Sequence, residues 1–148
     1  PHNFRTRYGW IERANAYSRH LQSEMVLCYK LRKKPNVVEE MSIIGDVEDK
    51  NVIIIDDMVD TAGTLVLAAQ KMQEKRARSI RAFATHPILS GNAIDRINDS
   101  PIEELVVTDS LPLPRTSEKI KVLSIAEIFA NTILAVNNNQ SISTNFVF

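Results

Sequence analysis

Cysteine, glycine and tryptophan are scarce in this sequence. Among 148 residues there are one cysteine, four glycines and one tryptophan. A single cysteine cannot form an internal disulfide, so a disulfide-stapled secreted fold is excluded and a reducing, cytoplasmic setting is expected. Cys28 lies in the apolar run of residues 25–29. We therefore expect it to be a small buried hydrophobe and not a reactive thiol.

Net charge and long apolar runs are also absent. Lysine and arginine number 18, aspartate and glutamate also number 18, and the formal net charge is zero. No global field therefore favours nucleic acid or an anionic membrane. The sequence contains no apolar run of about 18 residues and does not start with a signal-peptide pattern. We expect neither a nucleic-acid partner nor a membrane partner.

The chain alternates between strand-like and helix-like segments, and its length suits a single domain over residues 1–148. Expected helices cover residues 11–21, 64–75, 93–98 and 125–136, and expected strands cover residues 25–30, 52–56, 79–84, 105–108 and 120–123. Residues 37–47 are compatible with an additional hairpin arm. This alternation predicts an α/β fold with a mostly parallel open sheet flanked by helices. The continuous apolar run at residues 52–56 predicts a central strand that is buried on both faces.

Residues 52–64, VIIIDDMVDTAGT, place carboxylates directly after that strand and a small, hydroxyl-rich turn after the carboxylates. Ligands of such folds bind at the carboxyl ends of the strands. A helix that begins near Thr64 offers free backbone N–H groups and the positive end of its dipole to an anion. Ala62 and Gly63 would let the backbone approach a phosphate closely. Thr61 and Thr64 would each add a hydroxyl donor. The turn therefore predicts a phosphate cradle.

The carboxylates of Asp56, Asp57 and Asp60 would repel the same phosphate. They suit vicinal hydroxyls, or a metal that bridges to the phosphate. A sugar phosphate carries both groups, a phosphate at one end and vicinal hydroxyls at the other. The simpler interpretation is that Asp60 or Thr61 only caps the helix. Capping explains one or two acids, whereas the segment has three acids and two threonines around a glycine.

This stretch resembles the ribose 5-phosphate loop of the type I phosphoribosyltransferase fold. Three further stretches, YKLRKKPNVVEEMSIIGDVEDK, ATHPILSGNAIDRIND and ELVVTDSLPLP, resemble the ribose-phosphate pyrophosphokinase family, also called phosphoribosyl pyrophosphate (PRPP) synthetase, and the tail QSISTNF is similar to that family's C-terminal end. The resemblance runs from about residue 11 to the end of the chain. It implies a phosphoribosyltransferase-like fold.

The resemblance also implies an activity. Members of the family transfer the β,γ-diphosphoryl group of ATP to the anomeric hydroxyl of ribose 5-phosphate, which yields PRPP and AMP for nucleotide biosynthesis. They need Mg²⁺, contain two similar α/β domains and form homo-oligomers, usually hexamers. By resemblance, this chain is the C-terminal domain, with ribose 5-phosphate and ATP as its ligands.

Site residues follow from the matched motifs. The resemblance assigns the 5-phosphate to Asp60, Thr61, Ala62, Gly63 and Thr64, and the ribose hydroxyls to Asp56 and Asp57. Lys30 matches the family's catalytic lysine and Arg32 the arginine that follows it. Cations on a mobile loop suit phosphoryl transfer, since they can face the oxygens on which charge develops. The alternative for this basic run is a solvated loop. His86, between Thr85 and Pro87, is either a catalytic base or part of a structural or interface turn.

The sequence departs from the family before residue 11. Arg7 stands where the family has an aspartate that helps to hold the metal, and only Gly9 of a glycine pair remains. An arginine cannot bind Mg²⁺, so the metal ligands stay unassigned and residues 1–10 are divergent or foreign. The family's first domain, which supplies most of the ATP site, has no counterpart in these 148 residues. We expect the chain alone to bind ribose 5-phosphate weakly and to have little or no synthetase activity.

Two other functions compete with this one. The first is a non-catalytic, regulatory relative that assembles with active synthetase subunits. Arg7 and the missing first half favour it, whereas Lys30 and Arg32 speak against it. The second is a phosphoribosyltransferase that consumes PRPP on a nucleobase. The segment from Lys30 to residue 36 and the Thr-His-Pro stretch argue against this second alternative, and no separate hood for a base is visible.

Overall fold

The computed structural model describes residues 8–31 and 40–143, and the chain divides into two compact units. One unit consists of residues 1–25 and 126–148, and the other of residues 26–125. The first unit contributes helices α1 (Tyr8–Leu21) and α4 (Ala126–Asn137). Helix α4 has no buried residue, and its apolar side chains, among them Ile128, Phe129 and Ile133, are exposed. Within the described residues, no helix is long and apolar enough to cross a membrane.

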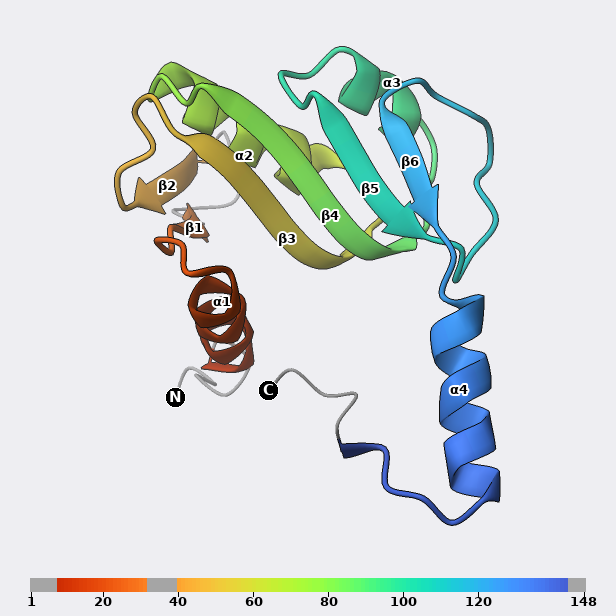
Figure 1. The fold of residues 1–148 in the computed structure, drawn as a ribbon. Coiled ribbons are helices and arrows are strands. Elements are labelled where there is room, and N and C mark those ends of the chain that lie inside the picture. Colours follow the sequence, from red (N-terminus) through yellow and green to blue (C-terminus); the bar gives the residue numbers. More distant parts are fainter. Residues whose placement is uncertain (1–7, 32–39, 144–148) are drawn as a thin grey trace, which may run out of the picture. The chain divides into compact units, whose positions relative to one another are not determined.

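The second unit holds two sheets (Figure 1). The smaller sheet pairs β1 (Leu27–Leu31) with β2 (Glu40–Ile44) in an antiparallel ladder, which confirms the expected hairpin arm. The larger sheet consists of β3 (Asn51–Val59), β4 (Ser79–Pro87), β5 (Glu104–Thr108) and β6 (Ile120–Leu123). Along the chain, helix α2 (Gly63–Glu74) connects β3 to β4, and helix α3 (Ala93–Asn98) connects β4 to β5. All its pairs are parallel, and the strand order β3-β4-β5-β6 follows the chain.

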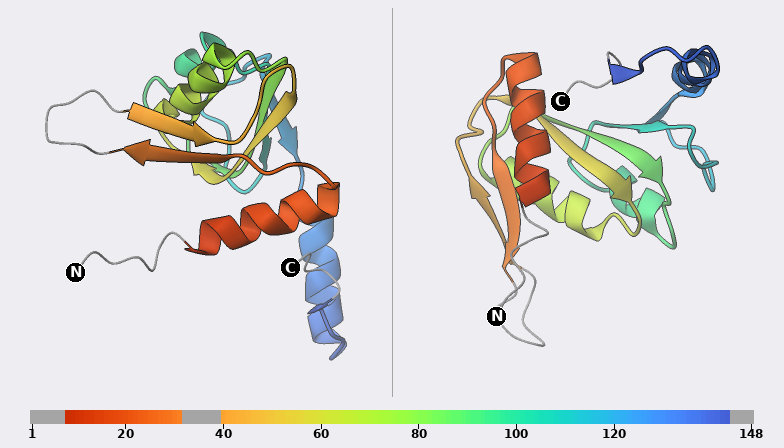
Figure 2. Two further views of the ribbon diagram at one scale, coloured as in Figure 1. Left: turned by 90° about the vertical axis from the view of Figure 1, so that its left-hand side faces the viewer. Right: turned by 90° about the horizontal axis from the view of Figure 1, so that it is seen from below.

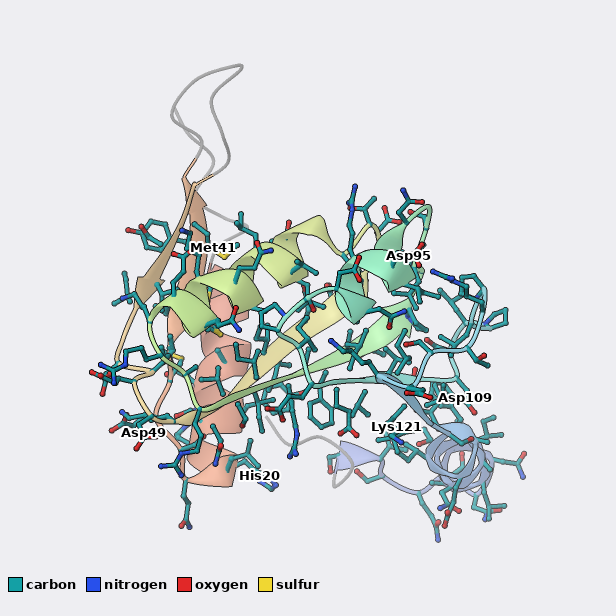
Figure 3. All side chains as sticks on the ribbon, turned by 90° about the horizontal axis from the view of Figure 1, so that it is seen from above. His20, Met41, Asp49, Asp95, Asp109 and Lys121 are labelled. Carbon is teal, nitrogen blue, oxygen red and sulfur yellow. The ribbon has the colours of Figure 1, made fainter. Side chains whose placement is uncertain are left out.

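The hydrophobic core lies between the larger sheet and the helices α2 and α3, which cover the same face of it (Figure 2). Buried side chains of this core include Ala69 and Met72 from α2, Ile94 and Ile97 from α3, and Ala82, Leu105 and Val107 from the strands. Met41 on β2 is also buried, and β2 packs against α2 (Figure 3). The predicted α/β fold with a parallel sheet and flanking helices is confirmed.

Burial of β3 differs from the expectation. The strand does not end at Asp56 but continues to Val59, because its pairing with β4 continues through Met58↔His86 and Val59↔Pro87. Burial alternates along it, with Ile53 and Ile55 exposed, so the expectation of burial on both faces was wrong. Among the described strands β3 is also an edge strand of its sheet and not a central one.

Cys28 is exposed, so the expectation of a buried cysteine was wrong. It lies in the two-stranded ladder, opposite Ile43, and not in the larger sheet. A two-stranded ladder has less protein around it than a sheet covered by helices. The surrounding chain still desolvates the sulfur enough to raise the pKa of the Cys28 thiol. A raised pKa favours the unreactive thiol over the thiolate.

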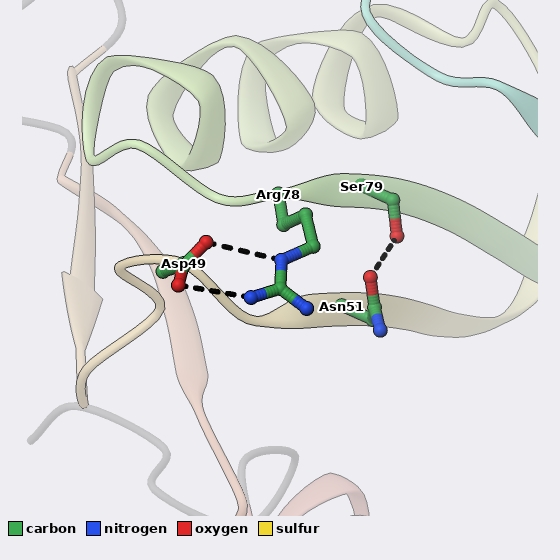
Figure 4. A network of polar contacts seen from close by, with 4 residues as sticks. All are labelled: Asp49, Asn51, Arg78 and Ser79. Carbon is green, nitrogen blue, oxygen red and sulfur yellow. Dashed lines mark hydrogen bonds and ion pairs between the residues drawn. The ribbon is translucent and has the colours of Figure 1, made fainter.

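Two polar contacts join the amino-terminal ends of β3 and β4 (Figure 4). The Arg78 guanidinium donates to both carboxylate oxygens of Asp49, at 3.0 and 2.9 Å, and the Ser79 hydroxyl donates to the Asn51 side-chain oxygen at 2.8 Å. The guanidinium lowers the pKa of the Asp49 carboxyl. These contacts lie at the end of the strands opposite to the end at which ligands of such sheets bind.

Candidate functional site

The link between β3 and α2 forms the candidate site. Strand β3 ends at Val59 and α2 begins at Gly63, so the link between them consists of Asp60, Thr61 and Ala62. Ala62 adopts a left-handed conformation, with φ 61° and ψ 3°, and its side chain is buried. Non-glycine residues adopt this conformation at an energetic cost and only where the surroundings hold them there.

Gly63 is not the residue with the unusual backbone. A Cβ atom placed on Gly63 would lie 3.7 Å from Nη1 of Arg96 and 3.8 Å from Oγ1 of Thr61, which are ordinary van der Waals distances. From the sequence, both Ala62 and Gly63 are expected to let the backbone approach a ligand closely. In the structure the tight turn is made by Ala62.

The amino terminus of α2 has no side-chain cap. The carboxylate of Asp60 instead accepts a hydrogen bond from the Ser90 hydroxyl. The interpretation of Asp60 or Thr61 as a simple helix cap was therefore wrong. The first backbone N–H groups of a helix need partners from outside it. At this terminus a bound anion could supply them.

The segment between β4 and α3 contacts this link and was not assigned a role from the sequence. The backbone N–H of Leu89 donates to the carbonyl oxygen of Val59 at 3.0 Å, and that of Ser90 to the carbonyl oxygen of Asp60 at 3.1 Å. Arg96 on α3 donates from Nη1 to the carbonyl oxygen of Thr61 at 3.1 Å. The sequence has no local signal for these contacts, because they depend on the register between β3 and β4.

Asp56 and Asp57 lie within β3, before its carboxyl end, and both are half-buried. The backbone N–H of Asp57 donates to the Asp56 carboxylate at 2.9 Å. Among the described residues, no cluster of three or more His, Cys, Asp or Glu side chains could hold a metal ion on its own. Mg²⁺, however, is commonly bound by one or two carboxylates together with substrate phosphates. Adjacent carboxylates beside a phosphate cradle therefore fit that ion.

The two basic residues of the candidate site are described only in part. Lys30 belongs to β1 and stands opposite Met41 in the ladder. Arg32 lies outside the described residues, and so does Arg7.

His86 ties two strand ends together. It belongs to β4, which extends to Pro87 and not only to Ala84 as expected. Its ring nitrogen Nδ1 lies 2.9 Å from the Ser110 hydroxyl, which in turn donates to the carbonyl oxygen of Thr85 at 3.1 Å. With that hydroxyl hydrogen already donated, Nδ1 is best placed as the donor to Ser110. These contacts are those of a structural tie between β4 and the segment after β5.

Asp109 directly follows β5 and therefore lies at the carboxyl end of that strand (Figure 3). Its carboxylate accepts hydrogen bonds from the Ser124 side chain and from the backbone N–H of Ile125, which lower the pKa of the carboxyl. The carboxylate therefore stays ionised and anchors the chain after β6. Its hydrogen bonds give it a structural role.

Residues 11–147 match the model of the family described as Phosphoribosyl synthetase-associated domain. The chain belongs to this family. The match covers all elements from within α1 to α4, so the loop after β3 and its neighbours are parts of a phosphoribosyl synthetase-associated domain.

Relatives of this phosphoribosyl synthetase-associated chain carry the name ribose-phosphate pyrophosphokinase. The protein of Porphyromonas gingivalis is 47% identical over 140 residues, which cover 95% of this chain and 45% of that protein. The protein of Campylobacter jejuni is 46% identical over 139 residues, which cover 94% and 45%. The crystal structure of phosphoribosylpyrophosphate synthetase from Mycobacterium smegmatis matches with a TM-score of 0.80 and 33% identity, over 88% of this chain and 43% of that chain. The chain thus spans less than half the length of these relatives.

Proposed function

We propose that this chain is the ribose 5-phosphate-binding half of a ribose-phosphate diphosphokinase, which makes PRPP and AMP from ribose 5-phosphate and ATP. The observation that carries the proposal is the uncapped amino terminus of α2 directly after a strand that bears Asp56 and Asp57. The family and its relatives' names support the choice of a phosphorylated ribose. The cytoplasm is the expected compartment.

The 5-phosphate would be held by the backbone N–H groups of residues 60–64 and the hydroxyls of Thr61 and Thr64. Both threonines are exposed, so their hydroxyls are accessible to a ligand. The helix dipole adds a favourable potential at the same place. Asp60 would act mainly through its backbone, because its carboxylate is already bound to Ser90.

Asp56 and Asp57 would face the ribose hydroxyls, which are hydrogen-bond donors that carboxylates accept. They are also the residues that would hold Mg²⁺, together with phosphate oxygens of the ligands. When bound, that ion would neutralise the charge on the transferred phosphates. Lys30 and Arg32 would stabilise the charge that develops on the phosphoryl oxygens, Lys30 as a point charge and Arg32 as a bidentate donor.

The rest of the reaction needs protein that these residues do not supply. The match covers only 45% of the length of each relative, so the relatives are more than twice as long as the matched part. We propose that the ATP site is completed by such additional chain and that the active form is a homo-oligomer. The isolated 148 residues are then expected to bind the sugar phosphate without sustained turnover.

The test is a calorimetric and NMR titration of the chain with ribose 5-phosphate, with and without Mg²⁺, and with free ribose as the control ligand. Binding that requires the phosphate and shifts the amide resonances of residues 60–64 would support the proposal. The variant Thr61→Val should weaken binding, because it removes a hydroxyl donor and keeps the shape. Thr116→Val is its matched control, since Thr116 is exposed and lies outside the loop.

Two outcomes would contradict the proposal. A folded chain that does not bind ribose 5-phosphate under any of these conditions would favour a regulatory relative that assembles with active subunits. Nucleotide formed from PRPP and adenine, or another nucleobase, would instead identify a phosphoribosyltransferase.

A further inference from the structure

Consecutive carbonyl groups at the end of β3 and in the link after it accept hydrogen bonds from one neighbouring segment. The carbonyl oxygens of Val59, Asp60 and Thr61 accept from Leu89, Ser90 and Arg96, respectively, at 3.0, 3.1 and 3.1 Å. All the donors come from the segment between β4 and α3 or from α3 itself. We call Leu89, Ser90 and Arg96 the brace.

The brace determines where the N–H groups of the link point. In a planar trans peptide the N–H of one residue points away from the carbonyl of the residue before it. The structure contains no cis peptide bond among the described residues. With the carbonyls of Asp60 and Thr61 held by the brace, the N–H groups of Thr61 and Ala62 face the opposite side. Successive N–H groups that face one side form an anion-binding concavity.

Arg96 adds a charge to this arrangement. A hydrogen bond from a guanidinium to a carbonyl is stronger than one from a neutral donor. It also polarises the peptide group, which makes the N–H of Ala62 a better donor. Arg96 thereby helps to keep Ala62 in its left-handed conformation, which is costly for alanine.

Ser90 makes a double contact with Asp60. Its backbone N–H donates to the Asp60 carbonyl and its hydroxyl donates to the Asp60 carboxylate. The carboxylate of Asp60 is thus directed to the brace. The contact occupies one carboxylate oxygen of Asp60 and directs it toward Ser90.

We propose that Ser90 and Arg96 are positioning residues of the sugar-phosphate site. They hold the peptide groups of the link so that its N–H groups are aimed at the 5-phosphate before the ligand arrives. Neither side chain needs to touch the ligand. The inference rests on the proposed function, because it presumes that the concavity takes a phosphate.

The first arm of the test measures binding. Arg96→Met should weaken ribose 5-phosphate binding about tenfold or more, since a charge-assisted hydrogen bond that fixes the cradle is lost. Arg96→Lys should recover part of the loss, because an ammonium can still donate to the Thr61 carbonyl. Ser90→Ala should weaken binding less, because its backbone donor remains.

Matched controls separate the brace from charge and stability. Arg115→Met removes an arginine that pairs with Asp95, which lies on α3 as Arg96 does. Arg115 has no hydrogen bond to the link. Ser117→Ala removes the hydroxyl that donates to Asn98, also on α3. Both should bind ribose 5-phosphate as the unmodified chain does. Equal losses in Arg115→Met and Arg96→Met would overturn the proposal, because the effect would then be one of net charge or helix stability.

The second arm needs no ligand. In the free chain, Arg96→Met should shift the amide resonance of Ala62, because the peptide group that Arg96 polarises is released, and Arg115→Met should not. An unchanged amide together with unchanged affinity in Arg96→Met would overturn the brace and leave the proposed function intact. If the unmodified chain binds no ribose 5-phosphate, the proposed function fails, and the Ala62 amide then decides whether the brace exists.

Discussion

Leu89 joins the hydrophobic core to the brace, and its replacement gives a sharp test of the local backbone. Its side chain is 2% exposed and belongs to the main core cluster, and its φ of 49° is left-handed. Leu89→Ala should lower the free energy of unfolding by about 2–5 kcal/mol, the range for a buried leucine that leaves a cavity. Leu111→Ala, at an exposed leucine in a loop, should cost less than about 1 kcal/mol.

The comparison with glycine tests the backbone angle itself. At an ordinary position glycine is about 0.5–1 kcal/mol worse than alanine, because it is more flexible in the unfolded chain. At a left-handed φ alanine is strained by about 1–2 kcal/mol and glycine is not. Leu89→Gly should therefore be as stable as Leu89→Ala or up to about 1.5 kcal/mol more stable. Urea unfolding followed by circular dichroism measures these differences. The reasoning fails if Leu89→Ala costs less than about 1 kcal/mol, or if the glycine variant is clearly the weaker one.

Three further predictions concern separate parts of the fold. Gly63→Ala should raise the free energy of unfolding, measured by thermal melts, by about 0.5–1 kcal/mol, because the added Cβ meets only ordinary contacts and alanine favours a helix. A lower free energy of unfolding in this variant would show that the space around Gly63 is tighter than the structure has it. The folded-state pKa of Asp49 is lowered, so its contribution is complete above its ordinary value of 3.8 and is lost as pH falls through the lowered value. Arg78→Met should thus make unfolding less dependent on pH below about 4, and equal slopes would contradict the Asp49 contact. Thr108→Val removes a 2.7 Å hydrogen bond to the Thr85 carbonyl and should cost about 0.5–2 kcal/mol in urea titrations, with Thr116→Val, at an exposed loop threonine, as a silent control.

The order and type of the elements could be predicted from the sequence, and some boundaries as well. Helix α3 and strand β6 occupy the residues that their apolar patterns indicated, because turn-forming residues bound both segments. Strand β3 was expected to end at Asp56, since acidic residues are poor strand formers. Backbone pairing with β4 as far as Pro87 outweighs that local preference. Such pairing depends on the partner strand and is not visible in one segment alone.

The candidate site was predictable only where it is local in sequence. Small and hydroxyl-bearing residues after a strand indicated the phosphate cradle, and the uncapped start of α2 agrees with that interpretation. The brace was missed because Ser90 lies 30 residues after its partner Asp60. Arg96 is likewise separated from Thr61 by a helix and a strand. Only the register of β3 against β4 brings these residues together.

The match between strand order and chain order in the larger sheet has a consequence for how the protein is made. Each described strand from β4 onward pairs with the strand that was synthesised before it. Once β3 has paired with β4, no described strand of this sheet must wait for a later one, so the sheet can grow as the chain leaves the ribosome. The loop after β3 and all members of its brace have been synthesised once Arg96 has been added, before β5 exists. A nascent chain that stops between α3 and β5 would already contain every residue that shapes the phosphate cradle.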